Sequence, residues 1–173
     1  MKSRSAALLF LQLLMLTSCA QDVSAVPDGT IIPPETLAPY AEWVHAAMNV
    51  NMYPLPIMTA SGKRLKTSMG FTGIREERVI AAYLPGQIIF NNVAWDPRSI
   101  GSQSYLIHEL VHHGQLMGDR PYPCDAARER EAYTLQNDWL VEHGAQPMVS
   151  EEFIDKISAC NDDKIGARLR NQE

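Results

Sequence analysis

His108-Glu109-Leu110-Val111-His112 is the stretch that decides how this chain is interpreted. Residues four apart on an α-helix are neighbours, with about 5–6 Å between their Cβ atoms, so both imidazoles can bind one metal ion. Glu109 lies about 100° around the helix axis from His108, where it can take a proton from a water molecule instead of ligating. One helix turn would thus supply two ligands and a general base. The alternative is an amphipathic helix whose histidines bind nothing.

The residues around this motif predict a helix with one buried face. Its start falls between Ser99 and Ser104, where several serines could cap it, and Gly118 with Pro121 beyond it marks its end. The buried positions expected on it are Ile107, Leu110, Val111 and Gly114. The motif histidines point away from this face, into a cleft, while His113 is expected to be exposed or to support the site without ligating.

The rest of the sequence predicts a small α+β domain built around the motif helix. Further helices are expected at about residues 36–50, 125–143 and 150–161. Residues 78–84 and 87–93 flank the turn dipeptide Pro85-Gly86 and predict a β-hairpin, and residues 51–75 hold turns and at most one short strand. We therefore expect a small antiparallel sheet or hairpin packed on the motif helix and on the helix that follows it.

A catalytic zinc site usually has three protein ligands and one open position, so a third ligand is needed. Glu129 and Glu131 lie on the helix after the motif, and side chains two apart point about 200° from each other. Glu131 adjoins the apolar stripe, whereas Glu129 shares a face with Tyr133 and Gln136. We therefore predict Glu131 as the third ligand. The alternatives are Glu129, Asp125 and Asp119, or a solvated helix face without a ligand.

The motif and the glutamate-bearing helix together resemble gluzincin-type metallopeptidases, including small bacterial zincin-like proteins, over residues 86–140. In gluzincins the third ligand comes roughly 20 residues after the second histidine, and Glu131 is 19 positions after His112. The metzincins are excluded because Gln115 and Gly118 stand where that family has a glycine and a third histidine. The resemblance implies that residues 88–92 form a strand lining the cleft.

This resemblance implies a zinc-dependent peptidase. A zinc ion would lower the pKa of its water to about 7, Glu109 would take the proton, and the hydroxide would attack an amide carbonyl. Tyr122 and Tyr133 are candidate donors to the oxyanion. The alternative is a zinc-binding envelope lipoprotein without catalysis, in which Asp119, Asp125 or His113 closes the fourth position. The sequence does not identify a substrate, a protein partner or an oligomeric state.

The N-terminus predicts export. Lys2 and Arg4 precede a short apolar run in residues 6–16, so residues 1–19 are expected to be a signal peptide. The segment Leu16-Thr17-Ser18-Cys19 resembles a bacterial lipobox, which would make Cys19 a lipid anchor and place the protein in the periplasm or outer envelope. Ordinary cleavage after Ala20 is the alternative. Residues 20–35 would then be a tether, residues 36–161 one domain and residues 162–173 a charged tail.

Export also determines how the other cysteines are interpreted. Cys124 and Cys160 remain as one pair in an oxidising compartment and are expected to form a disulfide, with a thiolate zinc site as the alternative. Of the 15 Lys and Arg residues, Lys2 and Arg4 lie in the signal segment, so 13 remain against 20 acidic residues, a formal charge of −7. This charge argues against nucleic acid as a partner.

Overall fold

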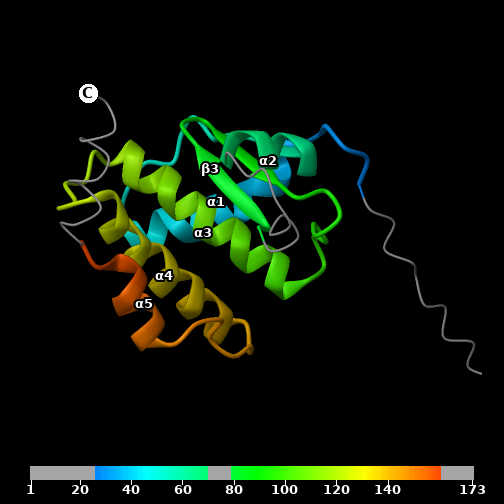
Figure 1. Cartoon of the computed structure of the whole chain (residues 1–173). Helices are drawn as coiled ribbons and strands as arrows, with labels where there is room; N and C mark the ends of the chain where they lie inside the picture. The colour runs from blue at the N-terminus through cyan, green and yellow to red at the C-terminus, as the bar shows by residue number, and fades with distance from the viewer. Residues whose placement is uncertain (1–25, 70–78, 161–173) are drawn as a thin grey trace, which may run out of the picture.

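Four short strands and five helices make up the part of the chain that the structure, a computed structural model, describes: residues 26–69 and 79–160 (Figure 1). The predicted signal peptide with Cys19 and the predicted tail lie outside the described residues. The α+β class predicted from the sequence is confirmed. In chain order the elements are β1 (Thr30–Ile32), α1 (Pro34–Met48), β2 (Ile57–Ala60), α2 (Gly62–Met69), β3 (Ala81–Leu84), β4 (Gln87–Phe90), α3 (Ile100–Met117), the 3-10 turn η2 (Asp125–Ala127), α4 (Arg128–Glu142) and α5 (Glu151–Ser158).

The sheet has the strand order β1-β2-β4-β3, and it is mixed where the sequence predicted an antiparallel one. The predicted hairpin is present, since β3 and β4 are antiparallel around Gly86, whose φ of +75° suits glycine in a tight turn. However, β2 pairs parallel to β4. The strand expected to line the cleft, residues 88–92, corresponds to β4 and is therefore an inner strand. The edge strands are β1 and β3, and β3 is the one that lines the cleft.

The first strand lies within the segment predicted to be a tether. Thr30–Ile32 pairs antiparallel with the Met58–Ala60 part of β2, and α1 begins at Pro34. Within the described residues 26–35, the Pro and Gly content correctly indicates the turn at Asp28-Gly29 but says nothing about pairing with a distant strand. Pro33 and Pro34 follow β1 at the start of α1, where a missing backbone N–H costs no hydrogen bond.

Helix α3 runs through the middle of the molecule, with the sheet on one side and α4 and α5 on the other (Figure 1). Its predicted apolar face is confirmed, since Ile107, Leu110 and Val111 are fully buried. A Cβ atom at Gly114 would lie 2.8 Å from the Met48 sulfur, so this glycine lets α1 approach α3 closely. Ser99 caps the helix and Gly118 ends it, both within the predicted limits.

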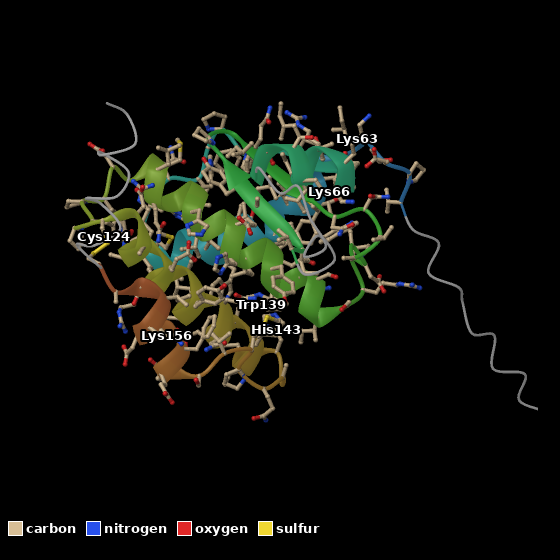
Figure 2. The ribbon with its side chains drawn as sticks, viewed as in Figure 1. Lys63, Lys66, Cys124, Trp139, His143 and Lys156 are labelled. Carbon is tan, nitrogen blue, oxygen red and sulfur yellow. A yellow bond between two sulfur atoms is a disulfide. The ribbon has the colours of Figure 1, made fainter. Side chains whose placement is uncertain are left out.

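A disulfide holds α5 in place. Cys124, just before η2, is bonded to Cys160, just after α5, with 5.9 Å between their Cα atoms, as predicted (Figure 2). At the other end of α5, Ser150 caps the helix, and the Asn137 side chain bonds the backbone of the connection at Met148 and Val149. Across residues 26–69 and 79–160, no helix combines the length and the apolar character that crossing a membrane requires.

Candidate metal centre

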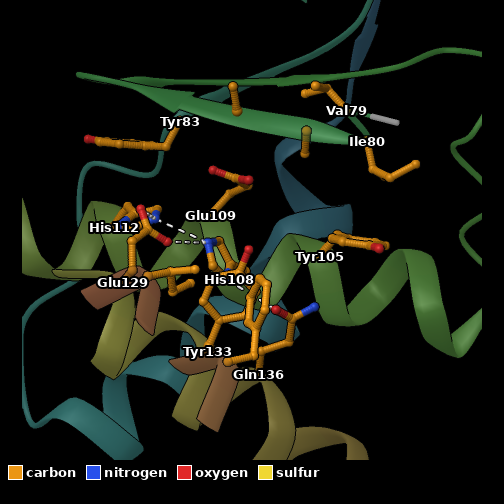
Figure 3. Close-up of a pocket in the computed structure, with 14 residues that line it drawn as sticks. Val79, Ile80, Tyr83, Tyr105, His108, Glu109, His112, Glu129, Tyr133 and Gln136 are labelled. Atoms are coloured by element: carbon orange, nitrogen blue, oxygen red, sulfur yellow. Dashed lines mark hydrogen bonds and ion pairs between the residues drawn. The ribbon is translucent and has the colours of Figure 1, made fainter. Parts of the chain in front are cut away.

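The two motif histidines of α3 converge as the sequence predicted. Their Nε2 atoms lie 3.2 Å apart, at the floor of a cleft between β3 and the α4–α5 pair (Figure 3). Glu109 projects toward β3, where its carboxylate accepts a hydrogen bond from the backbone N–H of Tyr83. The separation of the helix into an apolar face and a polar face therefore places Glu109 beside the histidines and the edge strand.

The third donor beside the histidines is Glu129. Its Oε2 atom lies 3.3 Å from Nε2 of His108 and its Oε1 atom lies 3.5 Å from Nε2 of His112. Among the described residues, His108, His112 and Glu129 are the group whose donor atoms come close enough together to hold a metal ion. Glu129 is 17 positions after His112 and belongs to the first turn of α4.

The prediction of Glu131 as a ligand is wrong. Its carboxylate points away from the histidines and accepts hydrogen bonds from Arg120, Tyr122 and Gln115. The error came from expecting the residue next to the apolar stripe of α4 to face the histidines. The face that carries Glu129, Tyr133 and Gln136 packs toward α3 instead, and Gln136 is fully buried. In the sequence, Glu129, Tyr133 and Gln136 are four and three residues apart, so they share one face of the helix. This spacing was the sequence signal for Glu129.

Glu131 still contributes to the site, through Gln115. The Oε1 atom of Gln115 lies 3.0 Å from Nδ1 of His112, while its Nε2 atom donates to Arg128 O and to Glu131. These two acceptors fix the orientation of the amide, so its oxygen must face the imidazole. Nδ1 of His112 therefore donates to Gln115, and Nε2 is the ring nitrogen that faces Glu129.

His108 is oriented in the same way by Gln136. Its Nδ1 atom lies 3.1 Å from Gln136 Oε1, and the amide nitrogen of Gln136 donates to Ser104 Oγ at 3.1 Å. Ser104 in turn donates to the carbonyl of Gly101 within α3. Metal-bound histidines characteristically donate their second ring N–H to a fixed acceptor. Here both acceptors are neutral side-chain amides.

The donor atoms lie close enough together to hold one zinc ion. Zinc–ligand bonds of about 2.0–2.1 Å directed to the corners of a tetrahedron place the donor atoms roughly 3.3–3.4 Å apart. The two Nε2 atoms lie 3.2 Å apart, and each faces its own oxygen of Glu129, at 3.3 Å for His108 and 3.5 Å for His112, while one donor atom from each residue falls within 4.8 Å of the others. Two imidazoles and one carboxylate are also a typical donor set of catalytic zinc sites. The residues present therefore match zinc in number, chemistry and spacing.

The electrostatics of the cluster follow from its burial and its charges. Burial raises the pKa of Glu109, against the opposing effects of His108 and His112. Burial alone would lower the pKa of His108, but its hydrogen bond to Glu129 and the charges of Glu109 and Glu129 raise the pKa overall. Burial opposes ionisation of Glu129, yet the hydrogen bond to His108 and the nearby imidazoles lower its pKa. Glu129 is thus held as the ionised donor.

The cleft above the cluster is a cavity of about 540 Å³, within the range of ligand-binding pockets. Tyr105 and Tyr133 line it with the cluster residues. Tyr122, a predicted oxyanion donor, is bonded to Glu131 outside this cavity, so Tyr133 is the candidate that remains. The buried His113 bonds the carbonyls of Met52 and Pro54 and the Tyr83 hydroxyl, so it supports the fold beneath β3.

Comparison with known proteins identifies a family without assigning an activity. No curated protein and no solved structure matches the chain. Residues 33–166, which include α1, the metal centre and both disulfide cysteines, match the family described as "Domain of unknown function (DUF6647)". Because this match spans most of the sequence, the chain belongs to the DUF6647 family.

Proposed function

We propose that the protein is a zinc-dependent hydrolase that cleaves amide bonds in peptides. The observation that carries this proposal is the cluster of His108, His112 and Glu129, whose donor atoms lie within 4.8 Å of one another, with Glu109 beside it. Asp119, Asp125 and His113, the residues that could close the fourth position, are not part of this cluster within the described chain. An open fourth position that faces a cavity favours a catalytic site over a purely structural one.

A zinc ion bound there would supply Lewis-acid polarisation of a carbonyl group and of a water molecule. Glu109 would accept a proton from that water as its oxygen forms a bond to the carbonyl carbon. Glu109 would then pass the proton to the departing nitrogen as the carbon–nitrogen bond breaks. One water is consumed, and the products are a carboxylate and an amine. A buried carboxyl whose pKa is raised is suited to both proton transfers.

The sheet edge supports a peptide as the substrate. β3 is the outer strand of the sheet, and its residues 81–83 line the cavity together with the cluster. The unpaired backbone groups of an edge strand can bind an extended peptide as an additional strand. Such a peptide would pass directly over Glu109, because the Tyr83 backbone already donates to the carboxylate of Glu109.

The test separates metal binding from chemistry. Purified protein should hold about one zinc per chain by elemental analysis, and His112→Ala should lose it. Glu109→Gln should retain the zinc and lose hydrolysis of an unfolded protein such as casein. Normal cleavage by Glu109→Gln would refute the mechanism, and zinc binding without any hydrolysis in the wild type would leave only a non-catalytic metal site.

We further propose that the protein acts in the bacterial envelope. Its predicted signal peptide and the lipobox-like Cys19 support this placement, and the Cys124–Cys160 disulfide suits an oxidising compartment. Radiolabelled palmitate should be incorporated into the wild type and not into Cys19→Ser. A Cys19→Ser protein that is still labelled would contradict the lipid anchor.

A further inference from the structure

We propose that the end of the cavity formed by α4 and α5 is a subsite for a large apolar side chain of the substrate. The proposal rests on the proposed peptidase function and adds a substrate class: an extended segment with a residue such as Phe or Leu next to the scissile bond. The subsite is defined by Tyr105, Tyr133, Phe153 and Ile157, with Ile80 from the segment that leads into β3.

A series of aromatic rings connects the candidate metal centre to this subsite. The Tyr133 ring packs edge-on to the ring of His108, with 4.4 Å between centroids, and Phe153 packs edge-on to Tyr133 at 5.7 Å. These residues come from α3, α4 and α5 in turn. A side chain that contacts Phe153 and Tyr133 would therefore lie within one residue's reach of the reacting carbonyl.

Phe153 is the exposed member of this series. It is 41% exposed, although its neighbour Ile154 is fully buried in the same helix. When a ligand covers a large apolar side chain that is open to water inside a cavity, the burial lowers the free energy of the complex. An aromatic ligand side chain would add a favourable ring–ring contact. The exposed face of Phe153 is thus explained as a surface that an apolar side chain of the substrate covers on binding.

The charge of the cavity excludes acidic side chains at this position. The described residues that line it include the carboxylates of Glu109 and Glu129 and no lysine or arginine. At the subsite, the described lining residues offer an aspartate or glutamate of the substrate no lysine or arginine to pair with. An apolar side chain has no such cost, so the lining favours Phe and Leu over Asp and Glu.

Helix α5 is positioned firmly enough to act as a wall of the subsite. The Cys124–Cys160 disulfide secures its end, Arg130 of α4 pairs with Asp155, and Ile154 packs into the protein. The position of Phe153 relative to His108 is therefore set by covalent and packing constraints and does not depend on one exposed contact. Specificity at one subsite requires a wall that does not yield to smaller side chains.

The experiment measures binding and cleavage with one set of peptides. The probes are fluorescein-labelled Gly/Ser peptides with a single central Phe, Leu, Ala or Asp. Fluorescence anisotropy with zinc-loaded Glu109→Gln gives affinity without turnover, and the wild type gives kcat/KM. We expect the Phe and Leu peptides to bind at least about tenfold more tightly than the Ala peptide, and the Asp peptide to bind most weakly.

Variants of the subsite test the assignment to Phe153. Phe153→Ala should remove most of the preference for Phe over Ala, and Phe153→Leu should restore it. Leu116→Ala is the matched control, since Leu116 is similarly exposed on α3 and does not line the cavity. Zinc content and circular dichroism would show that each variant folds.

The outcomes distinguish the subsite from the peptidase activity. Equal affinity for the Phe and Ala peptides, or an unchanged preference in Phe153→Ala, would overturn the subsite even if casein is cleaved. Selective binding that depends on Phe153 would uphold the subsite even if no peptide is cleaved, in which case the hydrolase proposal fails alone.

Discussion

Gln115 Oε1 lies 3.0 Å from Nδ1 of His112, and this contact connects the candidate metal centre to a hydrogen-bond network that reaches α1. Gln115 is held by Glu131, Glu131 by Arg120, and Arg120 also donates to the Met48 carbonyl at the end of α1. The orientation of one imidazole therefore depends on how three helices meet.

Replacing Gln115 should weaken zinc binding without removing a ligand. Gln115→Leu keeps the volume but loses the acceptor for His112 Nδ1–H, and such outer partners contribute about 10–100-fold to metal affinity. Competition with a chelating dye measures this change. Gln103→Leu, which removes a glutamine from the first turns of α3, is the control and should bind zinc normally. Equal affinities in the two variants would refute the orienting role.

Glu129 and Glu131 should differ sharply when each is changed to glutamine. Glu129→Gln removes an ionised donor and should reduce zinc affinity by more than the roughly 10–100-fold expected for an outer partner. Glu131→Gln should have a smaller effect, and little further effect in a Gln115→Leu background, because it acts through Gln115. Cobalt substitution should show the tetrahedral absorption spectrum in Glu131→Gln and lose it in Glu129→Gln. The reverse pattern would restore Glu131 as the ligand.

The comparison of these two glutamates shows what the sequence could and could not predict. The motif helix, its end at Gly118, the hairpin and the disulfide follow from local periodicity, turn residues and cysteine count. The choice between Glu129 and Glu131 depends on which face of α4 meets α3, and that face is set by tertiary packing. Residues such as Gln136 look solvated in sequence but are buried because His108 and Ser104 satisfy their amide groups.

The sheet shows the same limit. β3 and β4 are adjacent in sequence, so turn chemistry predicts their pairing. β1 and β2 are separated by α1, and β2 and β4 by α2 and β3, so their pairing is non-local. The resemblance assigned the cleft strand to residues 88–92, which form the inner strand β4, whereas the strand order makes β3 the edge strand that lines the cavity.

Zinc binding should weaken on acidification at a higher pH than an ordinary histidine would require. Protons and zinc compete for the Nε2 atoms, and the pKa of His108 is raised above its usual 6.5 by Glu129 and Glu109. Because protonation of His108 increases as the pH falls, the zinc affinity should begin to decrease while the pH is still above about 6.5. Calorimetric zinc titrations between about pH 5.5 and 8 measure this change. Repeating them in buffers of different ionisation enthalpy would also detect the proton that is released when zinc binds. His143→Ala, which removes an exposed histidine stacked on Trp139, should leave the profile unchanged.

Removing the disulfide should destabilise the fold. A bridge that closes a loop of 36 positions contributes about 3–4 kcal/mol by chain entropy. Replacing both Cys124 and Cys160 by serine should lower the free energy of unfolding in urea by this amount. Reducing agent should produce the same loss in the wild type and none in the double variant. A wild type whose unfolding is insensitive to reduction would show that α5 is held only by the packing of Ile154 and by the Arg130–Asp155 ion pair.

Tyr133 is the residue whose hydroxyl we expect to assist the chemistry. Burial, with the charges of Glu129 and Glu109, raises its pKa to about 12, so the hydroxyl stays protonated and can donate to a developing oxyanion at neutral pH. Removing one such donor costs about 10²–10³ in kcat. Tyr133→Phe keeps the ring that packs on His108 and Phe153, so KM and zinc content should change little while kcat falls. Tyr40→Phe is the matched control, because Tyr40 packs against Trp139 outside the cavity and the loss of its hydroxyl should leave kcat nearly unchanged. A Tyr133→Phe enzyme with full kcat would mean that the oxyanion is stabilised without this hydroxyl.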